Sequence, residues 1–518
     1  MAKNLIVCCD GTWNTPEQRE GGQPCPTNVV KLFNLSVEDD SQRRYYHPGV
    51  GTKGGLFDKA LGGGVGAGLS RNVESAYEWL CRNYTTGDRI FLFGFSRGAF
   101  TARSLGGFVA RCGLLDLSGL ADAEAWKRVA FVYDKGYRAP ATPATPATPA
   151  NWPAGYRFIP GPLEGGKVDI HMVGVWDTVG ALGVPDDLVL LDQLFDDARN
   201  YRFHDTRLSP SVRHARHAVA MDEMRASFAP TLWSELGDRP AGSSFKQQWF
   251  AGVHCDVGGG YADAGLSDGA LKWMVDEAMA VGLKVNPALL AQVQPNPRGV
   301  LHDSATGVWE LLRTLPRATP PLVPSLVGSA LSAQVMERHT VPPLTQAPYW
   351  PSRMLSVGDE VTLDVFARPH WNATGIYLEA GATYGFSATG EWLDADIACG
   401  PDGPKKGVFQ LGRIAQVFGN VLGELEEQYK DFTKKTGSDW WGTKRVESAD
   451  WFQLMGMIAN QPNADASGTP TEGEVIAIGR QAIHTPEASG YLYGFANDAW
   501  KFYGNNRGKV SLTIKRVK

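Results

Sequence analysis

The sequence has no long hydrophobic run and no large surplus of either charge. No apolar stretch approaches the ~18 residues of a membrane-spanning helix. The amino terminus lacks a charged region followed by a long apolar core, so we expect synthesis in the cytoplasm without a signal peptide. With 50 Lys and Arg against 55 Asp and Glu, the net charge of −5 gives no support to nucleic-acid binding or to global attraction to anionic membranes. Any contact with lipid should come from a local apolar surface.

Cysteine is scarce as well. The chain has 7 Cys, an odd number with no CxxC spacing, which argues against a disulfide framework and against a cysteine metal site. We expect reduced, mostly buried thiols. Hydrophobic residues make up 43% of the 518 residues, enough for large cores, and the length predicts two or three domains.

The most informative stretch is IFLFGFSRGA, Ile90 to Ala99. An apolar run enters a Gly-x-Ser-x-Gly pentapeptide, and residues at helical spacing follow it. This is the pattern of a nucleophile elbow, in which a serine sits on a strained turn between a buried parallel strand and a helix. The pattern indicates Ser96 as a nucleophile, against the alternative of a structural Gly-Ser turn.

A serine nucleophile needs a base and an orienting acid, which in this fold class follow it in the order Ser, Asp or Glu, His. The strand-like segment VDIHMVGVW ends at Asp177, our candidate acid, with Asp256 in reserve. The segment FKQQWFAGV runs into His254, our candidate base. We interpret the other histidines as structural or surface residues, because His171 lies in a strand and the remaining group, His204, His214 and His217, lies in an Arg-rich, solvated segment.

The oxyanion of an acyl transfer needs hydrogen-bond donors. The backbone N–H of Arg97, directly after the nucleophile, is the first candidate. The second is the loop after the amino-terminal strand Leu5 to Cys9, at Gly11 and Thr12. Asp10 in the same loop is a candidate accessory residue, through which the loop could bind phosphate or a metal. An ordinary structural turn is the alternative.

These motifs together resemble the α/β-hydrolase family of type VI secretion phospholipase effectors. The resemblance rests on seven segments in order over residues 1–355, with a tail that ends near YWPSRM: CDGTWN, PTNVVKL, YYHPGVGT, GLSRNVESAYEWL, GFSRGAF, GVWDTVGALG and WFAGVHCDVGGGY. It implies a mostly parallel sheet flanked by helices, and hydrolysis of phospholipid or other ester by Ser96, Asp177 and His254 without a catalytic cofactor. It further implies export by type VI secretion, contact with a secretion apparatus, a membrane surface and a neutralising immunity protein.

Three regions interrupt the hydrolase pattern. PATPATPATPA lies in a segment, 139–153, that we expect to form an extended surface loop. The proline-containing segment 305–345 is interpreted as a lid or cap that opens at a lipid surface, or as an ordinary packed helical excursion. Glycines at 57–69 lack the Lys-Ser/Thr of a P-loop, which argues against nucleotide binding.

From about residue 356 the chain changes to short alternating runs with many turn residues, which predicts a carboxyl-terminal β-sandwich over 356–518. The segment GYLYGFANDAWKFYGNNRGKVSLTI is similar to small bacterial calcium-dependent galactose-binding lectins. That resemblance implies a Ca²⁺ site formed by the side chains of Asp498, Asn505 and Asn506 and the carbonyl of Phe502, completed by a carbonyl near Ala395. The alternative is a polar hairpin loop.

An insertion at 418–451 departs from the lectin pattern and is predicted to be a helix and loop, which leaves glycan recognition open. Two functions therefore remain. The first is a serine esterase, most readily a phospholipase, whose β-domain positions it on a glycan, a headgroup or a secretion partner. The second is a catalytically silent scaffold that acts as a calcium-dependent binding protein.

Overall fold

The protein divides into two compact units. The computed structural model describes residues 2–11, 14–49, 65–138, 152–163, 166–180, 208–233, 239–306, 313–323, 325–326, 328, 330–404, 444–461, 471–500 and 502–518, without the side chains of residues 65–69. Unit 1 comprises Met1–Pro320, Val327–Tyr349 and Asn463–Thr471, and unit 2 comprises Pro321–Leu326, Trp350–Pro462 and Glu472–Lys518. The chain therefore enters unit 2 briefly at Pro321, before its main crossing at Trp350.

Unit 1 is built on a six-stranded sheet in which every pair of neighbouring strands is parallel. The strands in spatial order are β10 (Ser244–Phe250), β9 (Val212–Ala220), β8 (Ile170–Trp176), β5 (Arg89–Phe95), β1 (Asn4–Cys9) and β4 (Gln42–His47). The four inner strands are almost wholly buried, as expected when helices cover both faces. The order reverses direction beside β5 and β1, which places the switch point of the sheet near Ser96.

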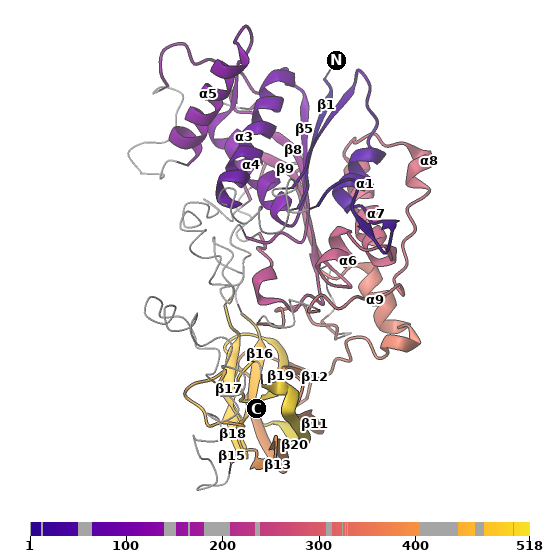
Figure 1. The fold of residues 1–518 in the computed structure, drawn as a ribbon, viewed down its shortest axis with the longest axis vertical. Coiled ribbons are helices and arrows are strands. Elements are labelled where there is room, and N and C mark those ends of the chain that lie inside the picture. The colour runs from indigo at the N-terminus through magenta and orange to yellow at the C-terminus, as the bar shows by residue number, and fades with distance from the viewer. Residues whose placement is uncertain are drawn as a thin grey trace. The chain divides into compact units, whose positions relative to one another are not determined.

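Helices cover the two faces of this sheet (Figure 1). On one face lie α3 (Val65–Asn83), α4 (Arg97–Cys112) and α5 (Asp122–Val132), and on the other lie α1 (Asn28–Leu35), α6 (His254–Gly258) and α7 (Gly265–Ala280). Alternate residues of β5 feed the two cores, since Leu92 packs under the first group and Phe91 and Phe93 under the second. The smaller elements of unit 1 are α8 (Pro287–Leu290), α9 (Ala333–Thr340), β2 (Arg19–Glu20) with β3 (Gln23–Pro24), β6 (Leu114–Leu115) with β7 (Phe158–Ile159), and short helices at Tyr133–Tyr137, Ala226–Phe228 and Leu344–Gln346.

Strand β9 corrects one expectation. Its sequence VRHARHAVA suggested a solvated segment, but the strand lies inside the sheet and His217 is fully buried. The arginine is accommodated because Arg216 forms an ion pair of 2.6 Å with Glu277 on α7. The ring of His217 accepts a hydrogen bond from the backbone N–H of Thr178. Polar residues are tolerated there because each finds a partner, which the local pattern does not reveal.

The segment around Arg317, within the predicted lid or helical excursion of 305–345, follows an extended path where the structure describes it. Residues 313–323 contain no helix, and the helix of this region begins only at Ala333. Prolines at 316, 320 and 321 cannot donate backbone hydrogen bonds, which explains the extended path. Arg317, Leu322 and Val323 are nonetheless buried, so the described part of this segment is packed into the protein.

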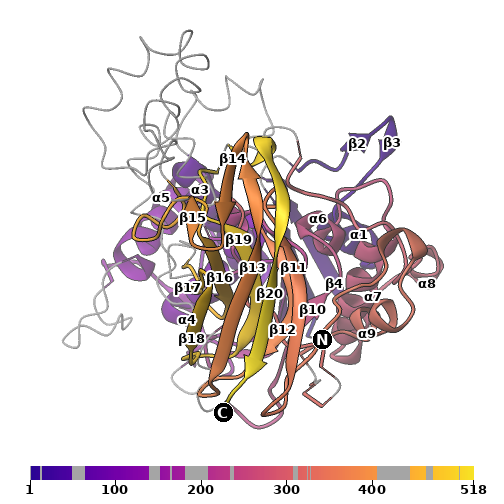
Figure 2. The same ribbon diagram turned by 90° about the horizontal axis from the view of Figure 1, so that it is seen from below.

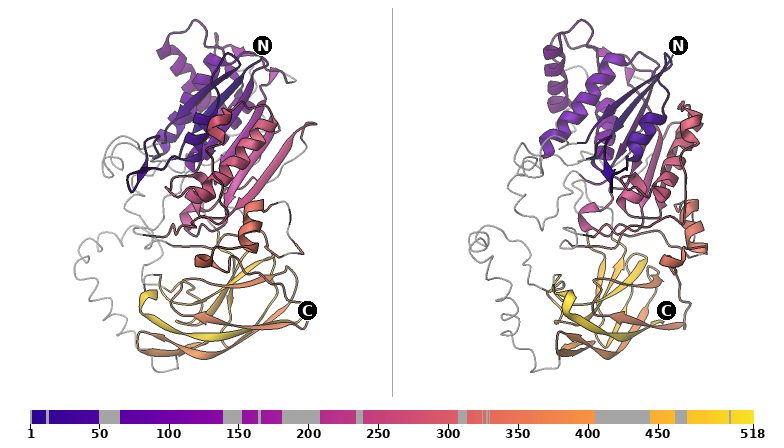
Figure 3. Two further views of the ribbon diagram at one scale, coloured as in Figure 1. Left: turned by 90° about the vertical axis from the view of Figure 1, so that its right-hand side faces the viewer. Right: turned by 45° about the vertical axis from the view of Figure 1, so that its right-hand side comes forward.

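Unit 2 consists of two antiparallel sheets that enclose one core (Figure 2; Figure 3). The first contains β11 (Glu360–Phe366), β20 (Asn506–Arg516), β13 (Tyr384–Asp394), β14 (Ile397–Gly400) and β15 (Gly403–Pro404), with β18 (Gln481–His484) also paired to β13. The second contains β12 (Asn372–Leu378), β19 (Gly490–Ala496), β16 (Leu454–Ala459) and β17 (Glu474–Ala477). A short helix, Tyr503–Asn505, precedes β20. The predicted β-sandwich architecture is confirmed.

Several predicted features fall outside the described residues. They are most of the Pro/Ala/Thr loop (139–151), the glycines at 57–64, Thr12, His204, and the predicted insertion up to residue 443. Within the described chain, no helix is both long and apolar enough to cross a membrane. All seven cysteines are free thiols and six are buried, Cys255 being half-buried.

Candidate active site

Ser96 follows β5 and precedes α4 with φ 58° and ψ −127°, a positive-φ conformation that L-residues rarely adopt. The turn requires glycine on both sides. A Cβ on Gly94 would lie 2.3 Å from the carbonyl oxygen of Gly98, and a Cβ on Gly98 would lie 2.2 Å from the carbonyl oxygen of Cys9. The strand and helix thus meet at backbone contact, and the local geometry is that of a nucleophile elbow.

Asp177 and His254 lie together although 77 residues separate them. Asp177 comes directly after β8 with φ 34°, and its Oδ2 accepts a hydrogen bond of 2.6 Å from His254 Nδ1. Both side chains are buried. Burial alone would raise the pKa of Asp177, but the charges and hydrogen bonds of Arg317 and His254 hold it well below its ordinary value. Asp177 is therefore an ionised acceptor that fixes the tautomer of His254.

His254 packs against the residue that precedes the serine. The centroids of the His254 and Phe95 rings are 4.6 Å apart, and Phe228 meets the imidazole edge-on at 4.9 Å. His254 Nε2 is buried and has no hydrogen-bond partner in the part of the chain that the structure describes. Burial lowers the pKa of His254 more than Asp177 raises it, so the imidazole is neutral at pH 7 with Nε2 as a free acceptor. A neutral imidazole with a free acceptor nitrogen is the protonation state that a general base needs.

The loop after β1 lies beside the serine. A Cβ on Gly11 would come within 3.2 Å of Ser96 Cβ. Asp10 holds this loop, because its buried carboxylate accepts hydrogen bonds from the Gly11 N–H (2.7 Å), the Thr27 hydroxyl (2.7 Å) and the Tyr46 hydroxyl (2.8 Å). Burial raises the pKa of Asp10. These three hydrogen bonds tie the Asp10 side chain to Gly11, to Thr27 and to Tyr46 on β4. We therefore interpret Asp10 as a residue that fixes the position of the loop after β1.

Asp256, the reserve acid, is paired elsewhere. Its Oδ1 bonds to Nδ1 of His302 at 2.6 Å, and its Oδ2 accepts from the backbone N–H groups of Val253 and His302. Asp256 thereby raises the pKa of His302. The structure brings Asp177, and not Asp256, to His254.

Three charged residues near the pair, Arg317, Glu223 and Arg225, were not predicted from the sequence. Arg317 forms two hydrogen bonds with Asp177. Glu223 forms a buried ion pair of 2.8 Å with Arg225 and accepts from the His254 N–H at 3.2 Å. Once β9 is identified as a strand, Asp222 and Glu223 stand just beyond its carboxyl end. Two acidic residues at that place would have indicated a contribution to the site. No sequence signal indicated Arg317, because it lies in a proline-rich stretch without a repeating pattern.

The predicted calcium ligands of unit 2 also cluster. Asn506 Nδ2 donates to Asp498 Oδ2 at 2.9 Å, and Asn505 Nδ2 donates to Asp394 Oδ1 at 3.1 Å. The Oδ1 atoms of Asn505 and Asn506 are buried, and neither has a hydrogen-bond partner among the described residues. Burial raises the pKa of Asp498 to about 7. Among the described residues, no group of three or more His, Cys, Asp or Glu side chains could hold a metal ion, so amide and backbone oxygens would have to complete a site here.

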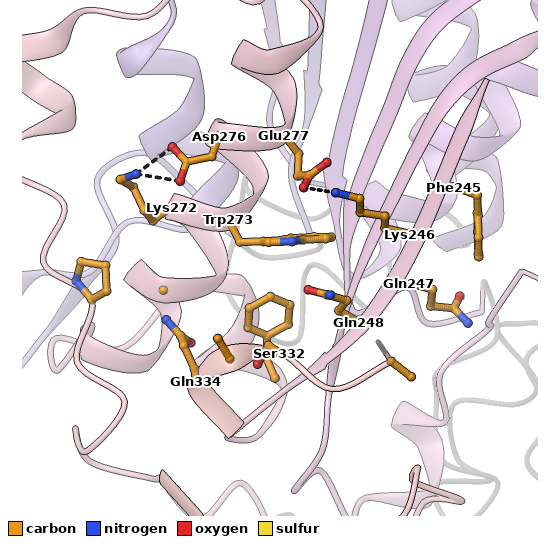
Figure 4. Close-up of a pocket in the computed structure, with 15 residues that line it drawn as sticks. Phe245, Lys246, Gln247, Gln248, Lys272, Trp273, Asp276, Glu277, Ser332 and Gln334 are labelled. Carbon is orange, nitrogen blue, oxygen red and sulfur yellow. Dashed lines mark hydrogen bonds and ion pairs between the residues drawn. The ribbon is translucent and has the colours of Figure 1, made fainter. Parts of the chain in front are cut away.

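A separate cavity of about 860 Å³ lies beside β10 and α7. Figure 4 shows the Trp273 ring between two ion pairs, Lys272 with Asp276 (2.7 Å) and Lys246 with Glu277 (2.5 Å). None of Ser96, Asp177 and His254 lines it, so we assign it no part in the chemistry of that group.

Comparison with known proteins gives one match to a family model. Residues 3–277 match the family described as "T6SS, Phospholipase effector Tle1-like, catalytic domain". An uncharacterised protein of Saccharomyces cerevisiae is 33% identical over 256 residues, 45% of this chain and 33% of that protein.

Two solved structures are also similar in part. The Tle1 effector bound to the VgrG spike of the type VI secretion system is 18% identical with a TM-score of 0.29, over 51% of this chain and 52% of that chain. The EclA N-terminal domain, a PllA-like lectin, is 17% identical with a TM-score of 0.18, over 30% of this chain and 94% of that chain. The chain spans a third of the length of the curated relative it matches and about half of the effector.

Proposed function

Because the chain belongs to the Tle1-like phospholipase effector family of the type VI secretion system, we propose that it hydrolyses ester bonds of phospholipids with Ser96, His254 and Asp177. The observation that supports this most directly is the 2.6 Å hydrogen bond between Asp177 and His254, with the His254 ring packed on Phe95 next to the elbow serine. A strained elbow costs about 1–3 kcal/mol, which favours an enzyme over a silent scaffold.

The proposed reaction proceeds in two halves. Ser96 Oγ attacks the ester carbonyl while His254 Nε2 takes the hydroxyl proton, and Asp177 stabilises the imidazolium through Nδ1–H. The oxyanion accepts hydrogen bonds from the N–H groups of Arg97 and Thr12. The Gly11 N–H donates to Asp10 Oδ1 at 2.7 Å and would have to leave that carboxylate to act as a third donor. His254 returns the proton to the leaving alcohol, leaving an acyl-Ser96. A water molecule, deprotonated by His254, then attacks the acyl carbonyl, and His254 returns that proton to Ser96 Oγ as the fatty acid leaves. No cofactor takes part in these steps.

Membership of the effector family also supports proposals about context. We propose export by type VI secretion, contact with a secretion-apparatus component, action at a membrane surface and the existence of a neutralising immunity protein. The solved effector bound to a VgrG spike is one example of such a contact, made by that protein.

The first test is hydrolysis of mixed phospholipid vesicles and of a soluble short-chain ester by wild type and Ser96→Ala. Wild type should release fatty acid from vesicles, and Ser96→Ala should lose about 10⁶-fold in kcat while staying folded. Ser118→Ala, which removes an exposed hydroxyl in the turn between β6 and α5, should behave as wild type. Cleavage of the soluble ester alone would make the protein a general esterase. No hydrolysis of either, or full activity in Ser96→Ala, would reject the proposal in favour of a binding protein.

We further propose that Asp498, Asn505, Asn506 and the carbonyl of Phe502 bind Ca²⁺, as part of a lectin-like module. The two buried asparagine oxygens without partners favour this, because a hard cation would satisfy both. These residues fit the ion, and Ca²⁺ when bound would link the 498–506 loop to the start of β20. A glycan is the partner that the lectin resemblance implies.

Calorimetric titration of the EDTA-treated full chain with CaCl₂ tests the calcium proposal. Wild type should bind one ion, and Asp498→Asn should abolish binding. Asp364→Asn provides a matched control, since that exposed carboxylate of β11 pairs with Lys509. Absence of binding at millimolar Ca²⁺ would refute the site and leave a polar hairpin loop.

A further inference from the structure

Arg317 binds both carboxylate oxygens of Asp177, the residue that also bonds His254. Its Nη1 donates to Asp177 Oδ1 at 2.7 Å, and its Nη2 donates to Asp177 Oδ2 at 3.0 Å. The side chains of the two residues are 4% and 0% exposed, so solvent does not screen the pair. A bidentate guanidinium fixes both the place and the plane of a carboxylate.

Both carboxylate oxygens of Asp177 are held by hydrogen bonds, including the oxygen that bonds His254. Oδ1 also accepts from the Ala220 N–H at 2.9 Å, and Oδ2 is shared between Arg317 and His254. With four donors on two oxygens, the carboxylate cannot rotate away from the imidazole without breaking several charge-assisted bonds. The backbone of Asp177 is strained, with φ 34°. Its surroundings, and not a relaxed backbone, must therefore hold the side chain toward His254.

The same guanidinium anchors the aromatic side of the site. Nη1 and Nη2 also donate to the carbonyls of Ala220 and Phe228, both at 2.6 Å. The Phe228 ring contacts the His254 imidazole. The segment that bears Arg317 is itself tied to this region, since the Leu315 N–H donates to Met224 O and the Ala226 N–H to Arg313 O.

Charge around His254 is balanced while the imidazole is neutral. The charged groups that face it are two carboxylates, Asp177 and Glu223, and two guanidiniums, Arg225 and, across Asp177, Arg317. Protonation of Nε2 adds a positive charge to this balanced set. Removing the Arg317 charge should therefore make the imidazolium easier to form.

We propose that Arg317 is a positioning residue of the hydrolase site, which holds Asp177 in the orientation that His254 requires and keeps His254 unprotonated. It acts on His254 through Asp177. The inference rests on the proposed function for its kinetic consequence, but its effect on His254 is measurable in the resting protein.

The test compares full-length wild type, Arg317→Gln and Arg317→Lys. Arg338→Gln is the matched control, because Arg338 is equally buried in unit 1 and donates to backbone carbonyls of Pro297 and Gly299 away from Asp177. Ester hydrolysis is measured from pH 5 to 9, and the His254 imidazole is titrated by NMR, with His254→Ala assigning its resonance. Circular dichroism checks the fold of each variant.

In Arg317→Gln we expect kcat to fall on the order of 10- to 100-fold with KM little changed, and both the acid limb of kcat/KM and the His254 titration to move to higher pH. Arg317→Lys should recover part of each effect. Arg338→Gln should lower stability without moving either pH curve. A folded Arg317→Gln with wild-type kcat and an unmoved His254 titration overturns the proposal. If wild type hydrolyses nothing, the proposed function fails, and the NMR titration still decides the role of Arg317.

Discussion

Two residues of the proposed site, Ser96 and Asp177, have positive φ angles of 58° and 34°. Each lies one residue beyond a strand, where the sheet ladder has just ended: the Ser96 N–H donates to Trp176 O, and the Asp177 N–H donates to Ala218 O. Positive φ in non-glycine residues costs of order 1–3 kcal/mol and persists only where the surroundings impose it. The neighbouring ladder bonds impose it here, and they aim both side chains off the carboxyl edge of the sheet.

His217 supports this arrangement one residue further along. Its ring accepts from the Thr178 N–H and bonds to Gln247 Oε1 at 3.1 Å, so Nδ1 must carry the proton and Nε2 must be free of one. Burial lowers the pKa of His217 to about 3, with the charge of Arg103 as a further cause.

A pH-dependent stability follows from that buried neutral ring. The unfolded chain takes up a proton as pH falls through about 6.5, whereas the folded ring stays neutral until far lower pH. The free energy of unfolding of unit 1 should therefore fall by about 2 kcal/mol from this residue between pH 7.5 and 5. Urea unfolding at both pH values should show a smaller drop in His217→Gln than in wild type. His339→Gln, which removes a half-buried histidine of α9, is the control, and an equal drop in both variants would contradict the assignment.

At the scale of elements, the site depends on the contact between β1, β5 and α4. Helix α4 begins one residue after the serine, and its glycine Gly98 packs on the carbonyls of Cys9 and Asp10 at the end of β1. That contact brings the Asp10–Gly11 loop against Ser96. The elbow and the Asp10–Gly11 loop therefore depend on the same close contact. A methyl group at position 98 would force them apart.

Two alanine substitutions in α4 should have opposite effects. Gly98→Ala places a methyl group 2.2 Å from backbone oxygen, and we expect a loss of about 3 kcal/mol or more and of ester hydrolysis. Gly106→Ala meets nothing nearer than Leu92 Cδ1 at 3.5 Å, and should gain up to about 1 kcal/mol from helix propensity with activity retained. Denaturant unfolding and ester assays measure both. Equal stability of the two variants would show that the contact is not needed.

At the scale of the whole molecule, two units with separate cores share one chain that crosses between them more than once. The first crossing follows Arg317 by only four residues, where Leu322 N–H donates to Tyr491 OH at 2.7 Å inside unit 2. Multidomain chains of this kind need not unfold in one step.

The calcium proposal has its clearest consequence at this scale. Thermal unfolding should show two transitions, and Ca²⁺ should raise the midpoint temperature of the unit 2 transition alone. The free energy of unfolding of unit 2 should increase by about 2.7 kcal/mol at a hundredfold excess of Ca²⁺ over Kd. Hydrolysis of a soluble ester should not respond to Ca²⁺ or EDTA, since the proposed chemistry lies in unit 1. Asp498→Asn should remove the calcium shift without changing the first transition. A calcium shift in the transition of unit 1 would argue against a separate module.

Much of the fold could be predicted from local patterns. The buried strands β1, β5 and β8 are largely apolar runs, which predicts a parallel sheet. Short runs of alternating apolar and polar residues, separated by turn residues, predict the β-sandwich. Strand β9 could not be predicted, because Arg216 and His217 are buried with partners on distant elements, among them α7, β10 and the loop after β8. Thr12, most of the proline-rich loop (139–151) and the predicted insertion up to residue 443 lie outside the described residues and stay predictions.

The elbow follows from local sequence, since only glycine at 94 and 98 allows strand and helix to meet at backbone distance, and such steric rules are local. Local patterns also placed an acid and a base at the ends of later strands, and left two aspartates as candidates for the acid. The folded chain distinguishes the two, because His254 bonds to Asp177 and Asp256 bonds to His302. It alone brought Arg317 to Asp177 across 140 residues. Pairing of buried charges depends on distance in space, on which sequence separation has no bearing.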